Sequence, residues 1–467
     1  MNALAETAEL RNDLDLPAKD ARHVLHPWAD LQALGSDRPV VMNSAKGVRV
    51  KDSEGTTYLD AIGGMWCMTV GYGCEELADA IGDQARQMAY YTSFGDVSNE
   101  PAAQLAEKLA ELSPGDLNRV HFTTGGSTAV ESAVRIAHYY FAAQGKPEKR
   151  HVLSRVNAYH GGTYLTQSLS GKAADKTHFH YETEFIHHLS SPGHDPDRDP
   201  LSAEARLTEL LDEMEAEIQR LGPENVACFV AEPILASGGV LTPPKGYQKA
   251  TLELCRKHGI LYVSDEVVTG FGRLGHFFAS EARFGIVPDM IITAKGITSG
   301  YQPLGAVLVS DRIAETISEA APSEKPVFSN GFTYSGHPVA CAAALTNIKI
   351  MTRDDICGHV RDVGPYFMAR LRELLDSPIV YTVRGDHLMA CVECWTGDEA
   401  GPNDKNMALA ARVDAYCQEA GLLVRPYENL CILSPPLVIS RDDIDEIVGI
   451  MGSALTRAAA DLEAGRL

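Results

Sequence analysis

Two residues with reactive side chains end two short apolar runs of this sequence. Asp265 ends the run GILYVSD, and Lys295, thirty residues later, ends MIITAK and precedes a segment of Gly, Thr and Ser. Such runs before Gly- and Ser-rich segments are typical of buried strands followed by loops. If the two strands are neighbours in a parallel sheet, both side chains meet at its carboxyl edge. A strand-end lysine ordinarily reaches water, but a desolvated lysine is an amine nucleophile.

A third segment has the residue types of an anion-binding turn. The stretch Thr123-Thr-Gly-Gly-Ser-Thr128 follows the strand-like run VHFT and precedes a helical pattern that begins near Ala129. Backbone N–H groups and a hydroxyl at a helix N-terminus can bind phosphate. Ser and Thr also favour these positions as ordinary helix caps. Taken alone, the turn leaves both interpretations open.

A second glycine-rich segment raises the alternative of an NAD-binding oxidoreductase. Gly270-Phe-Gly-Arg-Leu-Gly275 matches GxGxxG, and Asp289 follows at a distance suggestive of a ribose ligand. A dinucleotide site needs a helix of roughly ten or more residues after these glycines. Only HFFASEARF separates Gly275 from Gly285. Gly171-Lys172 likewise lacks the leading glycine of a P-loop, so we expect neither kind of site.

The anion-binding turn, the lysine and the carboxylate together fit the needs of pyridoxal phosphate. Its phosphate needs an anion site, its aldehyde needs an amine for a Schiff base, and its pyridine nitrogen needs a carboxylate that keeps the ring protonated. Each part is weak evidence alone. The ordered set, with Asp265 and Lys295 at the ends of successive strands, predicts this cofactor.

The chain resembles the class III aminotransferases of fold type I, in the branch that uses ω-amino acids or amines with pyruvate. The resemblance runs from about His26 to the C-terminal helix, nearly the whole chain. Five segments that are specific to this family carry it: AYHGGT (158–163), AEP (231–233), SDEVVTGFGR (264–273), PDMIITAKGITSGYQPLGAVLVS (288–310) and GFTYSGHP (331–338).

The resemblance implies a role for each matching residue. Lys295 matches the lysine that forms the Schiff base and moves the Cα proton, and Asp265 matches the partner of the pyridine nitrogen. Val267 matches the residue under the ring, and Tyr159 the aromatic on its other face. The remaining cofactor-binding matches are Gly126 and Ser127 at the phosphate, His160 and Glu232 near the ring, and Thr333, which implies a homodimer with shared active sites because it reaches the neighbouring subunit's phosphate.

The resemblance also implies the substrate pocket and the reaction. Trp66, Trp28 and Phe94 match the amine pocket, and Arg425 matches a mobile arginine whose fork takes a carboxylate. The expected reaction is a ping-pong transfer of an amino group from an amine donor to a keto acid acceptor such as pyruvate. A decarboxylase or aminomutase on the same scaffold remains an alternative.

Two departures from the family's pattern affect these expectations. The phosphate turn often reads Ser-Gly-Ser-Glu-Ala-Asn in the family, whereas residues 125–130 read Gly-Gly-Ser-Thr-Ala-Val. Backbone donors survive this change, but the side chain of the glutamate position is lost. Gly95 replaces a bulkier residue, which alters the room for substrate.

Composition narrows the class of protein further. The chain of 467 residues has a formal net charge of −22 and no run rich in Lys or Arg, so we expect no nucleic-acid partner. Its 10 cysteines are too sparse for a disulfide scaffold. Cys391 and Cys394 have CxxC spacing inside a strand-like run, where they face opposite ways. No signal peptide or membrane-length apolar run is evident, and we expect a cytoplasmic location.

Strand and helix patterns alternate from about 75 to 345, which predicts an α/β fold. We expect fold type I: a large domain with a mostly parallel seven-stranded sheet flanked by helices, plus a smaller α/β domain. The predicted boundaries are 1–75 for an N-terminal segment packing with the small domain, 76–345 for the large domain and 346–467 for the small one. Residues 176–200 contain many His, Asp and Pro residues; we expect a surface loop, since the spacing fits no metal-ligand set.

Overall fold

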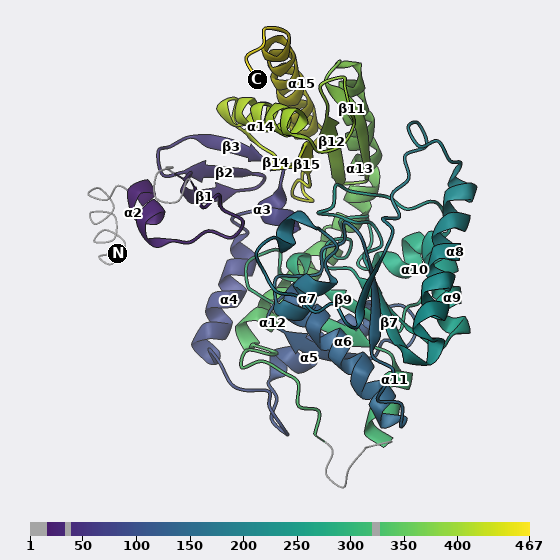
Figure 1. The fold of residues 1–467 in the computed structure, drawn as a ribbon. Coiled ribbons are helices and arrows are strands. Elements are labelled where there is room, and N and C mark those ends of the chain that lie inside the picture. Colours follow the sequence, from purple (N-terminus) through teal and green to yellow (C-terminus); the bar gives the residue numbers. More distant parts are fainter. Residues whose placement is uncertain (1–15, 33–38, 320–326) are drawn as a thin grey trace.

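A seven-stranded sheet forms the centre of the computed structural model, which describes residues 16–32, 39–319 and 327–467 (Figure 1). The strand order is β4-β10-β9-β8-β7-β5-β6. From β9 to β6 all neighbouring strands are parallel, and only β10 is antiparallel to its neighbours. The predicted mostly parallel sheet is confirmed. Its strands are β4 (Arg119–Thr123), β5 (His151–Arg155), β6 (Ile186–Leu189), β7 (Val226–Ala231), β8 (Leu261–Asp265), β9 (Met290–Thr293) and β10 (Gly305–Val309).

Helices cover both faces of this sheet because successive strand residues point to opposite sides. On one face, Val230 and Val263 pack in a core with the apolar residues of α6 (Gly126–Ala143). On the other, Phe229 and Tyr262 pack with residues of α8 (Ala203–Leu221) and α9 (Tyr247–Lys257). Strands buried on both faces read as continuous apolar runs, as β7 does.

Two four-stranded sheets lie above the central sheet in Figure 1 and join the two ends of the chain. In the first, β13 (Leu422–Leu423) pairs in parallel with β3 (Thr57–Asp60), beside β2 (Arg49–Asp52) and β1 (Met42–Lys46). The second has the order β11-β12-β15-β14. Its strands are β11 (Val380–Asp386), β12 (Met389–Cys394), β14 (Arg425–Tyr427) and β15 (Leu430–Leu433). Cys391 and Cys394 lie in β12, as predicted.

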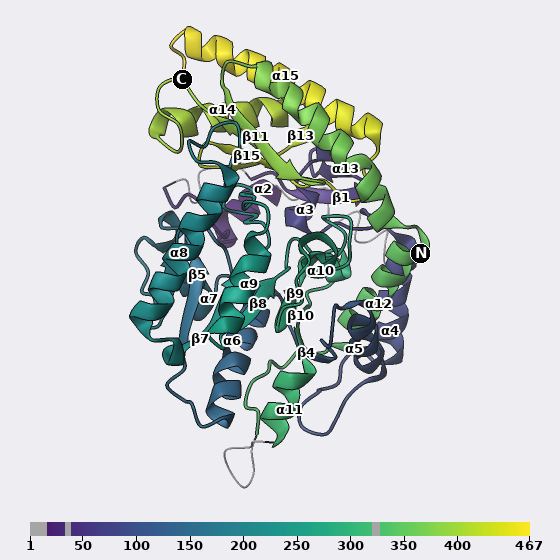
Figure 2. The ribbon, with the colours of Figure 1, turned by 90° about the vertical axis from the view of Figure 1, so that its right-hand side faces the viewer.

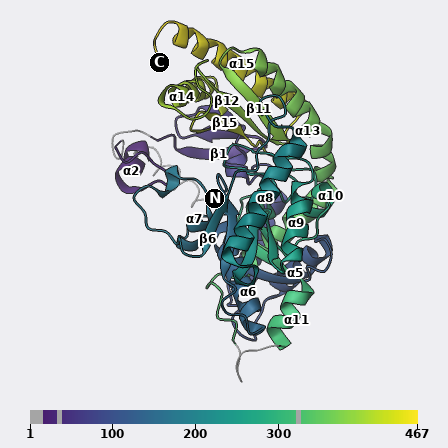
Figure 3. The same ribbon diagram turned by 45° about the vertical axis from the view of Figure 1, so that its right-hand side comes forward.

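Three long helices, α13 (Ile356–Arg372), α14 (Asp404–Glu419) and α15 (Arg441–Glu463), pack against this upper region. In Figures 2 and 3, α13 and α15 lie along its outer side. Below it, α12 (Pro338–Arg353) packs against α4 (Glu75–Gln87) and α5 (Glu100–Leu112). Position 345, the predicted end of the large domain, lies within α12. The shorter helices are α2 (Leu16–His23), α3 (Gly63–Trp66), α7 (Tyr164–Leu169), α10 (Ala279–Phe284) and α11 (Asp311–Glu319).

One prediction from the sequence is wrong in part. Residues 176–200 are not loop throughout, because β6 pairs in parallel with β5 at the edge of the central sheet. Its sequence is IHHL, in which only the end residues Ile186 and Leu189 are buried. The strand was not predicted because two of its four residues are histidines, which leaves no alternation of apolar and polar residues. No helix in the described part of the chain is long and apolar enough to cross a membrane.

Candidate active site

The structure brings Asp265 and Lys295 to one edge of the central sheet. β8 and β9 are parallel neighbours, and Asp265, the last residue of β8, pairs with Ile292. Lys295 follows β9 as the first residue of the 3-10 turn η3 (Lys295–Thr298). Its φ of +47° lies in the left-handed region, where a residue with a side chain is strained. Strain of this kind clusters at functional sites.

The amine of Lys295 lies in surroundings that disfavour its charged form. Burial lowers the pKa of Lys295, and the neighbouring Cys67, Asp265 and Glu232 oppose that effect. Lys295 is half-buried, and within the described residues its Nζ makes no hydrogen bond or ion pair. A partly desolvated amine without a fixed partner is suited to act as a nucleophile and as a proton carrier.

His160 holds the carboxylate of Asp265. Its Nδ1 lies 2.8 Å from Asp265 Oδ2, with both side chains almost completely buried. The backbone N–H of Val267 donates to the other oxygen, Oδ1, at 3.2 Å. The contact with His160 fixes the orientation of Asp265 toward the cleft edge of the sheet. The buried Nε2 of His160 has no hydrogen-bond partner among the described residues.

Glu232 positions the loop that carries Tyr159. Its two carboxylate oxygens accept the backbone N–H of Tyr159 at 2.9 Å and that of Ala236 at 3.0 Å. The side chain of Arg155 donates to the carbonyl oxygen of Glu232 at 2.6 Å. Burial raises the pKa of Glu232, the nearby His160 lowers it, and Asp265 raises it further. The geometry therefore assigns Glu232 to the support of Tyr159.

The predicted anion-binding turn opens α6, an 18-residue helix. The backbone N–H groups of residues 126–128 have no acceptor in the described part of the chain; the first helical bond is from Ala129 to Gly125 at 3.0 Å. Ser127 Oγ accepts the N–H of Gly162 at 3.0 Å, which ties this turn to the loop after Tyr159. Free N–H groups at the positive end of a long helix attract an anion.

Gly126 brings the turn against the other two segments of the site. A Cβ at Gly126 would lie 3.2 Å from Cγ1 of Val267 and 3.8 Å from Cβ of Ala294, the residue before Lys295. The absence of a side chain at this position permits that approach. The turn, the loop after β8 and the lysine thus meet in one place.

The predicted substrate residues occupy two different surroundings. The ring of Trp28 packs edge-on against that of Tyr159, with centroids 6.0 Å apart. The half-buried Arg425 makes no side-chain hydrogen bond or ion pair with any described residue, so its fork is available to a carboxylate. Trp66 is 3% exposed and packs in a hydrophobic cluster with Leu430 and Ile432.

Two predicted site residues lie on the surface of the single chain. Thr333 is exposed, and its carbonyl oxygen accepts the hydroxyl of Tyr90 at 2.6 Å. Phe94 is 53% exposed and adjoins Gly331. Tyr91 and Tyr334 are also exposed, at 54% and 58%. Among the described residues, neither Thr333 nor Phe94 contacts Lys295 of the same chain.

Three residues near the site were missed in the sequence. Cys67 is close enough to Lys295 to raise its pKa, and Lys172 and Asp175 lie beside Tyr159. Lys172 was considered only as part of an incomplete P-loop. No local pattern marks these three residues, because each reaches the site through the folding of separate segments.

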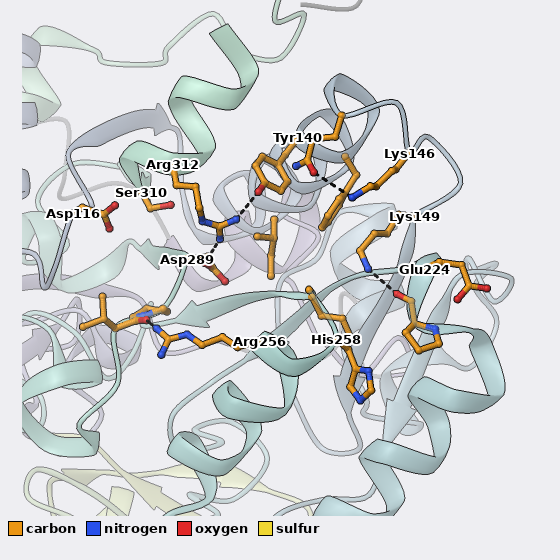
Figure 4. A pocket seen from close by; sticks show the side chains of 18 residues that line it. Asp116, Tyr140, Lys146, Lys149, Glu224, Arg256, His258, Asp289, Ser310 and Arg312 are labelled. Carbon is orange, nitrogen blue, oxygen red and sulfur yellow. Dashed lines mark hydrogen bonds and ion pairs between the residues drawn. The ribbon is translucent and has the colours of Figure 1, made fainter. Parts of the chain in front are cut away.

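A cavity of about 880 Å³ lies at the opposite edge of the sheet, where β8 begins and β10 ends (Figure 4). Its charged groups largely pair with protein oxygens: Arg312 lies 2.5 Å from Asp289, and Lys149 donates to the carbonyl oxygen of Pro223 at 2.6 Å. The described residues that line it include none of the predicted site residues. This cavity is therefore separate from the candidate site at Lys295.

The glycines of the GxGxxG segment serve a compact loop. Gly272 has a φ of +92°, and a Cβ there would lie 2.7 Å from Leu437. The helix that follows, α10, has only 6 residues. The expected lack of a long helix after these glycines is confirmed, and with it the reason to reject a dinucleotide site here.

Comparison with known proteins agrees with this geometry. Residues 32–455 match the model of the family described as aminotransferase class-III. A putrescine–pyruvate aminotransferase from Pseudomonas aeruginosa is 36% identical, over 98% of this chain and 99% of that protein. A solved (S)-enantioselective omega-transaminase from Thermomicrobium roseum is 39% identical, with a TM-score of 0.91 over 96% of this chain and 99% of that one. A PMP-bound aminotransferase from Vibrio fluvialis is 33% identical, with a TM-score of 0.91 over 97% of this chain and 100% of that one. The chain belongs to the class III aminotransferases.

Proposed function

We propose that this protein transfers an amino group from an amine or ω-amino acid to a keto acid such as pyruvate, with pyridoxal phosphate as cofactor. The observation that carries the proposal is the meeting of three groups at one sheet edge. These are the amine of Lys295, the carboxylate of Asp265 held by His160, and the free N–H groups of α6.

The residues present fit pyridoxal phosphate, on which class III aminotransferases depend. The unpaired N–H groups of residues 126–128 and the hydroxyl of Ser127 suit the phosphate. Asp265 suits the pyridine nitrogen, because a carboxylate there keeps the ring protonated. Val267 and Tyr159 suit the two faces of the ring. Lys295 is the one predicted site residue with a primary amine, as the aldehyde requires.

Each residue of the site has a distinct task in the transfer. When bound, pyridoxal phosphate supplies an aldehyde for the amine and a ring that accepts electrons. The Nζ of Lys295 removes the Cα proton of the donor and returns a proton later, as general base and then general acid. His160 keeps Asp265 oriented, and Glu232 keeps the Tyr159 loop in place. Arg425 binds the carboxylate of the keto acid acceptor.

The choice of amine donors over α-amino acids rests on the pocket and on the relatives. Trp28 and Tyr159 present aromatic surface to the substrate side, and Trp66 packs nearby in the core. The Pseudomonas aeruginosa relative is a putrescine–pyruvate aminotransferase, which supports an amine as donor and pyruvate as acceptor.

The active form in this proposal is a homodimer with shared sites, in the cytoplasm. Thr333 and Phe94 lie with Tyr91 and Tyr334 on an exposed aromatic surface of the single chain. Exposed aromatic patches of this kind support a subunit interface. Thr333 then reaches the phosphate of the neighbouring subunit. The proposal also keeps the domain boundaries predicted at residues 75 and 345.

Replacement of Lys295 tests the proposed reaction directly. Lys295→Ala removes the only group proposed to move the Cα proton, and we expect a loss of turnover of about a thousandfold or more with an amine and pyruvate. The surface variant Lys349→Ala serves as control, since Lys349 only pairs with Glu76. Substantial transamination by Lys295→Ala would contradict the assignment. Carbon dioxide release or an isomerised amino acid, instead of alanine from pyruvate, would favour a decarboxylase or an aminomutase.

A further inference from the structure

A pair of buried charges lies beside the substrate side of Tyr159. Lys172 follows α7, and Asp175 lies in the 3-10 turn η1 (Ala174–Lys176). Their side chains are 4% and 7% exposed. The ammonium of Lys172 lies 5.9 Å from the ring centroid of Tyr159 and 3.6 Å from that of Tyr427. The ammonium of Lys172 therefore lies against the rings of Tyr159 and Tyr427.

The carboxylate of Asp175 lacks a hydrogen-bond donor. Its Oδ2 is fully buried and has no partner among the described residues. The nearest cation, Nζ of Lys172, is 3.8 Å away, which is too far for a hydrogen bond. Lys172 donates instead to the carbonyl oxygen of Ser237, at 3.3 Å. A buried carboxylate oxygen without a donor is unfavourable, so native proteins leave one where a ligand or water supplies the donor.

The charge of Asp175 acts on Tyr159 and on Arg425. Burial raises the pKa of Tyr159, Asp175 raises it further, and Arg425 lowers it. Burial likewise lowers the pKa of Arg425, which Tyr159, Tyr427 and Asp175 raise. Asp175 and Arg425 thus act on Tyr159 with opposite charges.

We propose that Asp175 binds the distal ammonium of a diamine donor. This inference rests on the proposed transamination and names the donor class. An α,ω-diamine offers one amine for transfer and a second, charged one that supplies the donor missing at Asp175 Oδ2. Arg425, with no ion pair of its own, takes the carboxylate of the keto acid in the other half-reaction. One chamber thereby accepts a dication and an anion in turn without a charge clash.

Three donors with carbon chains of equal length separate the effect of the distal charge from the effect of molecular shape. They are 1,4-diaminobutane, butylamine and 4-aminobutanoate, which end in an ammonium, a methyl group and a carboxylate. In the wild type we expect kcat/KM to be higher for the diamine than for butylamine. In Asp175→Asn, which keeps the size of the side chain, the diamine-to-butylamine ratio should fall about tenfold or more. The 4-aminobutanoate-to-butylamine ratio should rise, because the repulsion is removed.

Asp197→Asn is the matched control, since it makes the same change at an exposed position of the chain. Its ratios should equal those of the wild type. Equal losses for all three donors in Asp175→Asn would show a structural role for the Lys172–Asp175 pair and overturn the proposal. An unchanged diamine-to-butylamine ratio would overturn it as well. Thermal melting of each variant checks that the chain remains folded.

A binding measurement separates this inference from the proposed function. In Lys295→Ala, which cannot turn over, calorimetric titration gives the Kd for 1,4-diaminobutane and for butylamine. We expect tighter binding of the diamine, and loss of that preference in Lys295→Ala/Asp175→Asn. A preference in binding without any transamination by the wild type would keep the subsite and reject the proposed reaction. Equal Kd values for the two amines would reject the subsite.

Discussion

Lys295 combines a strained backbone with a half-buried side chain whose pKa is lowered. The positive φ places it just after β9, and burial makes its charged form unfavourable. Asp265 and Glu232 partly offset this lowering of the pKa. A lysine whose pKa is lowered is suited to accept a proton and to return it.

The lowered pKa of Lys295 predicts a pH dependence in the cofactor-free protein. The neutral amine should appear below the ordinary value of 10.5, so reductive methylation of Lys295 should reach half its maximal rate at a lower pH. At pH values between the lowered pKa and 10.5, Lys295 is more protonated in the unfolded chain than in the folded protein. The contribution of Lys295 to the free energy of unfolding therefore rises with pH in this range. Mass spectrometry of the peptide follows Lys295, with the exposed Lys349 as reference. A midpoint at or above 10.5 would contradict the account.

The positions of single residues could be predicted where they depend only on the order of strands along the chain. Asp265 ends β8 and Lys295 follows the end of β9, and parallel strands end at one edge, so their position followed from the pattern. The contact of His160 with Asp265 joins residues 105 positions apart. The support of Tyr159 by Glu232 depends in the same way on a tertiary contact. No local sequence pattern predicts a role for the Lys172–Asp175 pair. Its proposed role depends on the ring of Tyr427 and on Arg425, which lie far away in the sequence.

At the scale of elements, the N-terminus of α6 and the ends of β8 and β9 form the proposed cofactor cradle. The altered sequence of residues 125–130 keeps the free backbone N–H groups. Gly126 lets the helix approach Val267 closely. The cradle thus depends more on backbone approach than on a particular side chain in this turn.

Gly126→Ala tests that approach. The new Cβ would lie 3.2 Å and 3.4 Å from the two methyl groups of Val267, so Val267 must shift into the space proposed for the ring. We expect affinity for pyridoxal phosphate to fall about tenfold, in line with the typical cost of overpacking. Fluorescence titration of the cofactor-free protein measures this. Gly449→Ala in α15, where nothing lies within 4 Å, is the matched control. Wild-type affinity in Gly126→Ala would show that the cradle does not depend on this contact.

Long amphipathic elements were predictable, and short or fully packed ones were not. α6, for example, follows the helical pattern predicted to begin near Ala129. α12 was missed because its buried residues lie nearly all around it, so no apolar stripe stands out. β6 was missed because its two central residues are histidines. The pairing of β13 with β3 joins the two ends of the chain, which no local pattern indicates.

At the scale of the whole molecule, the exposed aromatic surface around Thr333 is the feature a single chain leaves unexplained. Tyr91, Phe94 and Tyr334 are each more than half exposed. In the proposed homodimer this surface is buried, and Thr333 completes the site of the other subunit. Each active site then needs Lys295 from one chain and Thr333 from its partner.

Complementation tests this sharing of sites. Thr333→Asp places a negative charge at the proposed phosphate contact, and Lys295→Ala removes the amine, so each homodimer should be inactive. A heterodimer of the two variants has one intact site. Random pairing of equal amounts makes half the dimers mixed, so co-expression should restore about a quarter of wild-type activity per chain. Mixed dimers that form but show no activity would contradict shared sites.

The most direct measurement is the visible spectrum of the purified protein with pyridoxal phosphate, first with 1-phenylethylamine or 1,4-diaminobutane and then with pyruvate. The account predicts a yellow absorption that bleaches with amine alone and returns with pyruvate, with one alanine formed per recovery. Bleaching with amine alone shows the first half-reaction, and recovery shows the second. The absence of any yellow absorption with the wild type, or an absorption that neither amine bleaches, would contradict the central claim.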